Sequence, residues 1–132
     1  VLGAIGCGDS GGDGSNYAAQ TRTYFLAAEH VEWNYAPLGM DPVFNQPIPD
    51  PFGHQLEYEK IRYIQYTDAT FTTQVSQPNW LGILGPMIRG AVGDTLKVTF
   101  LNRTDRHLSI HPHGVKYDKD SEGAEYGTPG LG

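Results

Sequence analysis

The sequence has only one cysteine, Cys7, among its 132 residues. A single thiol can form neither an internal disulfide nor a cysteine-rich zinc site. Positive charge is also scarce, because nine Lys and Arg residues face fifteen Asp and Glu residues, and the formal net charge is -6. Nucleic acids and anionic membranes bind basic surfaces, so we exclude both as partners of the folded chain.

Helical periodicity is absent as well, whereas glycine, proline and aromatic residues are abundant. The chain has 17 Gly, 9 Pro, 8 Tyr and 5 Phe residues. This mixture favours short strands joined by turns over long helices. A length of 132 residues is sufficient for one compact domain with a modest core, but not for two.

Residues 1–16 are expected to precede the folded domain, as a signal-peptide remnant followed by a flexible tether of Gly, Ser and Asp. The apolar residues 1–6 are too few to span a bilayer but fit the end of a signal peptide. The segment Ala4-Ile5-Gly6-Cys7 resembles a bacterial lipoprotein signal, except that Ala4 stands where Leu is usual. We therefore consider two roles for Cys7: the lipid-anchored first residue of an extracytoplasmic protein, or an incidental free or buried thiol.

From residue 17 onward, alternating apolar and polar residues predict several strands and no helix. Strands are expected at 21–35, 61–67, 87–89 and 95–102, with a further extended segment at 107–113. Residues 36–52 contain five prolines and are expected to form a loop or excursion. The absence of a crossover pattern favours an antiparallel β-sandwich or barrel. We expect no folded structure before about Tyr17. Because the end is turn-rich and has no closing strand, we expect only the first part of a domain.

His111 and His113 lie two residues apart in the last of these extended segments. Because side chains alternate along a strand, both imidazoles point to the same face, about 6.6 Å apart at ~3.3 Å per residue. Pro112 has no N–H and places this point at a strand end or sheet edge. The pair can bind one metal ion or two neighbouring ions, and the alternative is two surface histidines beside a turn.

The other three histidines are not expected to be ligands. His30 has polar neighbours and His54 lies in the proline-rich loop, so both are expected to be solvated. His107 shares a face with His111 but lies about 13 Å away along an ideal strand, at ~3.3 Å per residue.

Asp118, Asp120 and Glu122 resemble the start of an EF-hand loop, with Gly123 at the sixth position. The twelfth position is Pro129 instead of the required Glu, so an EF-hand is excluded. We expect a solvated acidic loop, with a looser calcium or sodium site on these carboxylates as the alternative.

A further short motif, Asn102-Arg103-Thr104, matches the acceptor pattern for N-linked glycosylation. Such a short pattern arises often by chance, and it has no function in a bacterium. The sequence alone therefore assigns it no role.

Ordered blocks of sequence between Thr23 and Tyr126 resemble a known family. The blocks are residues 24–29 with 31–36, 65–68 with 70–71, 81–86 followed by 93–94, 111–115 and 120–124. They are similar to the plastocyanin-like domains of multicopper oxidases, in the branch that contains ceruloplasmin, hephaestin and coagulation factors V and VIII. Several blocks in the same order are far more specific than one His-x-His pattern.

The resemblance implies a cupredoxin-like fold, a Greek-key β-sandwich, with copper as the cofactor. It implies that His111 is a ligand of the type 2 copper and His113 of a type 3 copper in the trinuclear cluster that reduces dioxygen. A blue type 1 copper needs a Cys thiolate, and Cys7 lies outside the expected fold, so no blue site is expected here. A complete trinuclear cluster takes four His-x-His motifs, and this sequence contains one.

We therefore predict that residues 17–132 are the N-terminal portion of a plastocyanin-like domain of an extracytoplasmic multicopper oxidase. The complete enzyme would oxidise a metal ion or a phenolic reductant and reduce dioxygen. Its partners would be the remaining domains of the same oxidase or a complementing subunit. One alternative is a non-enzymatic cupredoxin-like module for copper binding, structure or protein interaction. Another is a copper-storage or delivery domain that holds a single ion.

Overall fold

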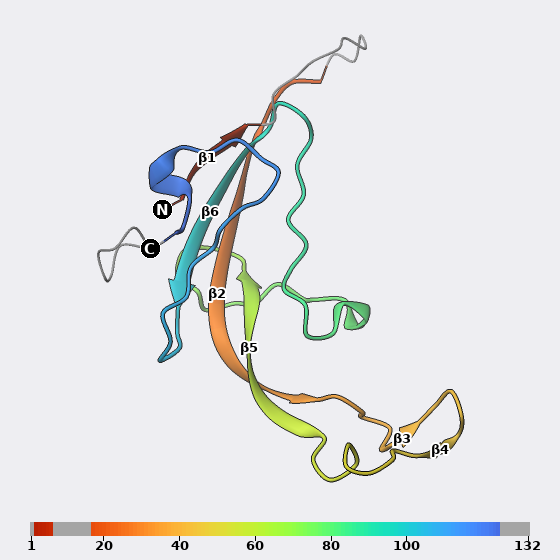
Figure 1. The fold of residues 1–132 in the computed structure, drawn as a ribbon. Helices are drawn as coiled ribbons and strands as arrows, with labels where there is room; N and C mark the ends of the chain where they lie inside the picture. Colours follow the sequence, from red (N-terminus) through yellow and green to blue (C-terminus); the bar gives the residue numbers. More distant parts are fainter. Residues whose placement is uncertain (1, 7–16, 125–132) are drawn as a thin grey trace.

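The structure is a computed structural model that describes residues 2–6 and 17–124. A four-stranded sheet has the order β1-β6-β2-β5, and its arrangement can be followed in Figure 1. The strands are β1 (Leu2–Gly6), β2 (Thr21–Asn34), β5 (Glu57–Tyr66) and β6 (Thr95–Asn102), with a separate pair formed by β3 (Met40–Asp41) and β4 (Gln46–Pro47).

Helical structure within the described residues is limited to the 3₁₀ turns η1 (Asn79–Leu81) and η2 (Lys119–Ser121). No helix in this part of the chain has the length and apolar character needed to cross a membrane. The predicted all-β class is therefore confirmed. The expected tether and Cys7 lie outside the described residues.

β2 is the long strand in the middle of the sheet. It pairs antiparallel with β5 on one side and parallel with β6 on the other. Leu26, Ala27 and Ala28 lie where β2 has both neighbours, and all three are buried. Residues 24–28 of β2 are apolar at consecutive positions, whereas burial alternates along its second half.

The N-terminal segment belongs to the sheet, which corrects one expectation. β1 pairs antiparallel with β6, although the sequence predicts no fold before Tyr17. Without β1, β6 would expose a row of N–H and C=O groups that can pair with an extended segment. A second correction concerns strand direction. The sequence predicts an antiparallel arrangement, whereas β2 and β6 pair in parallel. The long connection through residues 35–94 makes this crossover feasible.

The strand predicted at 87–89 and the extended segment at 107–113 form no ladder with another strand, and tyrosine side chains bond to both backbones. Residues 87–89 and 107–113 have no strand assignment. The hydroxyl of Tyr24 donates to the carbonyl oxygen of Arg89 at 2.8 Å and accepts from its N–H at 3.1 Å. The hydroxyl of Tyr63 donates to the carbonyl oxygen of Ser109 at 2.9 Å. The other predicted strands are confirmed as β2, β5 and β6, with β5 beginning earlier than predicted.

A hydrophobic core forms between the sheet and the loop that follows β5. Ile64, Tyr66 and Phe71 are buried together, and the rings of Tyr66 and Phe71 pack edge to face with centroids 5.6 Å apart. Arg103 attaches the loop to the sheet, since its guanidinium donates to the carbonyl oxygen of Phe71 at 2.7 Å and to the carboxylate of Glu29 at 2.8 Å. The loop is therefore fixed by both apolar and polar contacts.

The chain after β6 turns back alongside the sheet, as the blue segment of Figure 1 shows. Tyr63 of β5 packs against Phe100 of β6, with ring centroids 5.6 Å apart. The same tyrosine holds Ser109 of the returning segment through its hydroxyl. The sheet thus positions the segment that carries the His-x-His pair.

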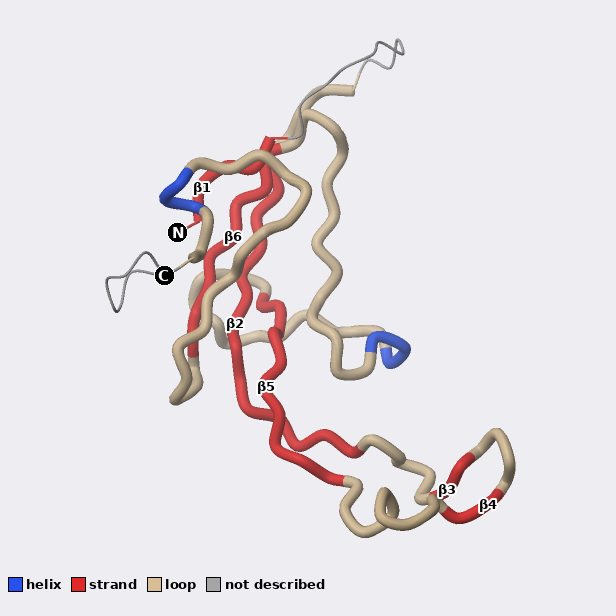
Figure 2. The backbone as a smooth tube through the Cα atoms, viewed as in Figure 1, coloured by secondary structure: helices blue, strands red, loops and turns tan. Residues whose placement is uncertain are grey.

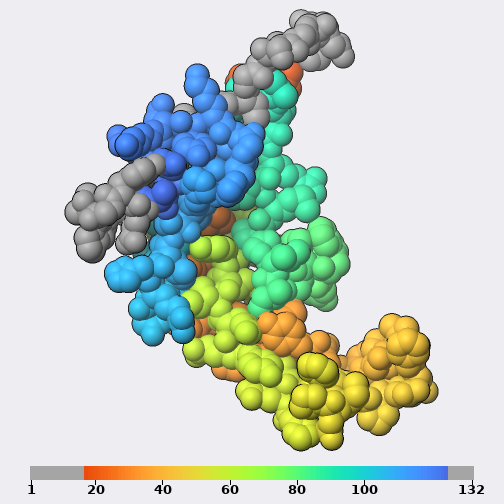
Figure 3. All heavy atoms as spheres, viewed as in Figure 1, coloured from red at the N-terminus to blue at the C-terminus, as the bar shows by residue number. Residues whose placement is uncertain are grey.

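Residues 35–56 leave the sheet as a projecting excursion, in agreement with the proline pattern. The excursion carries β3 and β4 and stands apart from the sheet in the backbone and space-filling views (Figures 2 and 3). Its large apolar side chains are exposed, namely Leu38, Val43, Phe44 and Phe52. A group of exposed apolar side chains is typical of a surface that contacts another protein segment.

Candidate metal centre

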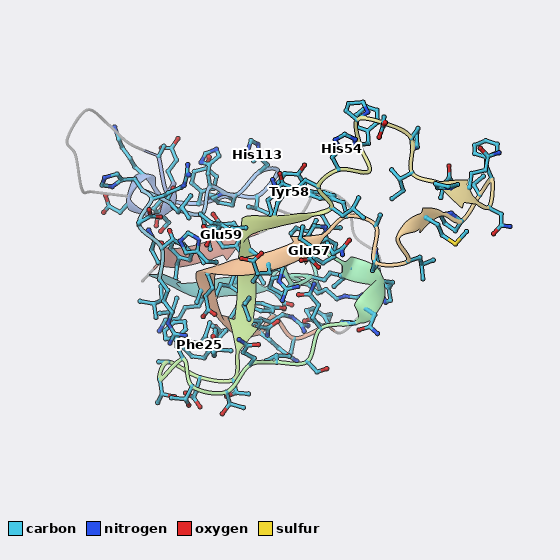
Figure 4. All side chains as sticks on the ribbon, turned by 90° about the horizontal axis from the view of Figure 1, so that it is seen from below. Phe25, His54, Glu57, Tyr58, Glu59 and His113 are labelled. Carbon is cyan, nitrogen blue, oxygen red and sulfur yellow. The ribbon has the colours of Figure 1, made fainter. Side chains whose placement is uncertain are left out.

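His111 and His113 lie side by side on the segment after β6. Their rings are perpendicular with centroids 4.8 Å apart, and both residues are exposed whereas Pro112 between them is half-buried. The alternation predicted from the sequence therefore places both imidazoles on the accessible side of the segment. Figure 4 shows His113 on this segment and His54 on the projecting excursion.

The orientation of His111 is set by a backbone carbonyl group. Its Nδ1 lies 2.6 Å from the carbonyl oxygen of Glu122. A carbonyl oxygen can only accept, so Nδ1 carries the hydrogen and donates. In the neutral imidazole the lone pair is then on Nε2, which is the form that binds a metal ion.

The segment that carries both histidines is fastened at Ser109. The hydroxyl of Ser109 donates to the carbonyl oxygen of Gly123, next to the carbonyl group that orients His111. The carbonyl oxygen of Ser109 accepts the hydroxyl of Tyr63 at 2.9 Å, and burial raises the pKa of that phenol. Tyr63 therefore stays a neutral donor across the physiological pH range.

Gly123 allows the two parts of this loop to approach closely. Its φ is +67°, and a Cβ atom at this position would lie 1.9 Å from the carbonyl oxygen of Ile110. Only glycine fits such a contact at a left-handed φ. The ring of Tyr117 closes another side of the site, with its centroid 5.9 Å from that of His111.

The acidic residues near the site do not form a cation cage. Asp118 and Asp120 are exposed at η2, and Glu122 contributes its backbone carbonyl group to His111. Among residues 17–124, no three His, Cys, Asp or Glu side chains are arranged to hold a metal ion. Within this part of the chain, the histidine pair therefore lacks a third protein ligand.

The remaining histidines lie elsewhere. His30 is exposed, as predicted, and its two ring nitrogens lie 3.1 Å from a carboxylate oxygen of Glu59 and 3.3 Å from one of Asp105. His54 is largely exposed and pairs with Asp50 at 2.7 Å. The structure records no contact between His107 and the pair within the described residues.

Sequence reasoning found the two histidines but missed the groups that position them. The sequence places Tyr63 only in a predicted strand, and a backbone carbonyl group such as that of Glu122 has no residue-specific pattern. Gly123 could indicate the tight turn, but its place after Asp118, Asp120 and Glu122 resembles the sixth position of a cation loop.

A family model for multicopper oxidases matches residues 61–130. The chain belongs to the multicopper oxidase family. Copper is the cofactor of this family, and the resemblance inferred from the sequence blocks is confirmed, together with the cupredoxin-like fold class.

Three curated relatives illustrate the similarity. Hephaestin of Homo sapiens is 40% identical over 117 residues, which are 80% of this chain and 10% of hephaestin. Ferroxidase HEPHL1 of Mus musculus is 40% identical over 127 residues, or 85% of this chain and 11% of the relative. Coagulation factor V of Mus musculus is 44% identical over 107 residues, or 76% of this chain and 5% of the relative. The chain thus spans about a tenth or less of these relatives.

The donor set of the site suits this family's metal. Imidazole nitrogen is a good copper ligand in softness and geometry. A ligand histidine commonly donates its other N–H to a carbonyl group, which fixes the tautomer and the ring orientation, and His111 makes this contact with Glu122. Both histidines are exposed, so their rings are accessible to a metal ion.

Proposed function

We propose that this chain is the part of an extracytoplasmic multicopper oxidase that supplies one His-x-His motif to a trinuclear copper cluster. His111 would bind the type 2 ion and His113 a type 3 ion. The proposal is carried by one observation: two exposed imidazoles with centroids 4.8 Å apart, one with its Nδ1 engaged by a carbonyl group, in a chain of this family.

Bound copper would supply one-electron transfer and the reduction of dioxygen. The protein's own residues orient and support the ligands. Glu122 holds His111 in the tautomer with Nε2 available, while Tyr63 and Ser109 keep the segment in place. His111 and His113 act as ligands and are assigned no proton transfer.

The reductant in this proposal is a metal ion or a phenol. A ferrous ion is supported by the relative named ferroxidase HEPHL1, 40% identical to this chain. The relative named coagulation factor V, at 44% identity, favours the alternative of a cupredoxin-like module without oxidase activity. The experiment described below distinguishes an oxidase from a module without oxidase activity.

The partners in this proposal are the remaining domains of the same oxidase or a complementing subunit. Two observations support a partner. The described part of the chain lacks a third ligand for the pair, and the excursion exposes Val43 and Phe44 at 80% and 70%. Lipid attachment through Cys7 stays a prediction.

The test uses the protein isolated from its native source. Intact mass, copper content and the absorption spectrum are recorded, and dioxygen consumption is followed with ferrous ion and with a phenol. We expect consumption with at least one reductant, and its loss in His111→Ala and His113→Ala but not in His54→Ala, a change on the excursion. Copper without dioxygen consumption would support the non-enzymatic module, and one copper ion per chain would support storage or delivery.

A further inference from the structure

The triplet Asn102-Arg103-Thr104 lies at the end of β6, in the loop that leads to the histidine segment. It is the only Asn-x-Ser/Thr triplet in the sequence. Asn102 is exposed and Thr104 is half-buried. The acceptor asparagine therefore stands at the surface of a tight loop, where a large polar group can be carried.

The side chain of Asn102 already has an ordered set of contacts. Its Oδ1 accepts from the N–H of Thr104 at 3.0 Å and from the hydroxyl of Thr104 at 2.8 Å. Its Nδ2 donates to the carbonyl oxygen of Arg106 at 2.6 Å. The amide nitrogen carries two hydrogens, and this carbonyl group takes one of them.

These contacts are compatible with a glycosylated asparagine. Attachment of a sugar replaces one N–H of the amide and leaves the other, so the bond to Arg106 and both bonds from Thr104 can persist. Arg103, the middle residue, points its guanidinium into the contacts with Glu29 and Phe71 and does not compete for the amide. The loop can thus keep its conformation with a glycan attached.

We propose that Asn102 is an N-glycosylation site. The inference rests on the extracytoplasmic location in the proposed function, and it takes the relatives from Homo sapiens and Mus musculus as a guide to the kind of cell. The donor is an oligosaccharide joined to a lipid diphosphate. A bond forms between Nδ2 of Asn102 and the anomeric carbon, the carbon–oxygen bond to the diphosphate breaks, and the amide proton is released.

Such a glycan also restricts how the rest of the protein can be arranged. A bulky hydrated oligosaccharide at Asn102 keeps other domains away from the loop of residues 102–106. The partner domains must then contact other surfaces, such as the apolar excursion or the open side of the histidine pair. With a glycan at Asn102, the loop of residues 102–106 would face solvent in the complete molecule.

The test is peptide mass spectrometry on the protein secreted by its native source, before and after treatment with peptide-N-glycosidase. We expect the peptide that contains position 102 to carry an oligosaccharide, and the enzyme to remove it with deamidation at that position. Asn102→Gln and Thr104→Ala should both lose the glycan, whereas Thr104→Ser, which keeps the hydroxyl, should retain it. An unmodified peptide in the secreted protein would overturn the proposal. Copper content and dioxygen consumption of the same sample report separately on the proposed function.

Discussion

The imidazole of His111 donates a 2.6 Å hydrogen bond from Nδ1 to the carbonyl oxygen of Glu122. This contact joins the histidine segment to the loop after η2, eleven residues further along the chain. The conformation of that loop therefore decides which imidazole nitrogen is available to a metal ion. Changes that disturb the loop should affect metal binding even where they touch neither histidine.

Gly123→Ala is the most direct disturbance of this loop. The new Cβ would lie 1.9 Å from the carbonyl oxygen of Ile110, at a φ of +67°. We expect a loss of unfolding free energy well above the about 1–2 kcal/mol of a left-handed alanine alone, together with weaker copper binding. Denaturant unfolding and a copper titration measure the two effects.

Gly39→Ala is the matched control for this prediction. Gly39 also has a φ of +67°, but no atom lies within 4 Å of its added Cβ, and it belongs to the projecting excursion. It should cost only about 1–2 kcal/mol and leave copper affinity unchanged. Equal losses for the two variants would show that the close approach to Ile110 is not what makes Gly123 necessary.

Tyr63→Phe tests the attachment of the histidine segment to the sheet. The change removes the hydroxyl that donates to Ser109 at 2.9 Å and keeps the ring that packs on Phe100. We expect a loss of about 1 kcal/mol in unfolding free energy and faster amide hydrogen exchange around Ser109. Unchanged exchange in this segment would mean that the hydroxyl does not hold it.

The same residue predicts a response to alkaline pH. Burial raises the pKa of Tyr63 above its usual value near 10. A group whose pKa is higher in the folded state stabilises the fold below its unfolded pKa, and this contribution is lost as pH rises through the folded pKa. The stability advantage of the wild type over Tyr63→Phe should therefore shrink at high pH.

Asp94 predicts a response to acid. Its buried carboxylate accepts from the N–H of Ala91, the hydroxyl of Tyr17, the guanidinium of Arg22 and the N–H of Gln20. These contacts hold the pKa of Asp94 well below its usual range, the bond from Ala91 having the largest effect. The stabilisation is present above the unfolded pKa, about 4, and is lost as pH falls toward the lower folded value.

Asp94→Asn is the variant that measures this effect. The amide has a single acceptor oxygen and brings an NH₂ group toward donors, so the variant should be less stable at neutral pH. The difference in unfolding free energy between wild type and variant should shrink when the pH is lowered from 7 toward 3. A difference independent of pH would contradict the account of Asp94.

The strands that the sequence predicts well are those with a local burial pattern. In β6 the buried Val98 stands next to the exposed Lys97, and in β2 the apolar run at 24–28 contains the buried residues 26–28. The pairing of β1 with β6 joins Leu2 to Val98, and no local pattern reports a partner so distant in the sequence. The parallel register of β2 and β6 is unpredictable for the same reason.

In the candidate site, too, the sequence predicts some features and only the fold determines others. The two-residue period of an extended chain correctly places His111 and His113 on one side, even though the segment is not part of a ladder. Their ligand role comes from the resemblance and stays a prediction. The orienting carbonyl group of Glu122 could not be predicted, because every residue has such a group and only the fold decides which one is close.

The central claim is that His111 and His113 are copper ligands, and copper stoichiometry in the natively isolated protein tests it most directly. Wild type, His111→Ala, His113→Ala and the control His54→Ala are compared by elemental analysis and by electron paramagnetic resonance. The account predicts that each change in the pair lowers the copper content and alters the type 2 signal, whereas His54→Ala matches the wild type. Full copper content and an unchanged spectrum in both variants of the pair would contradict it.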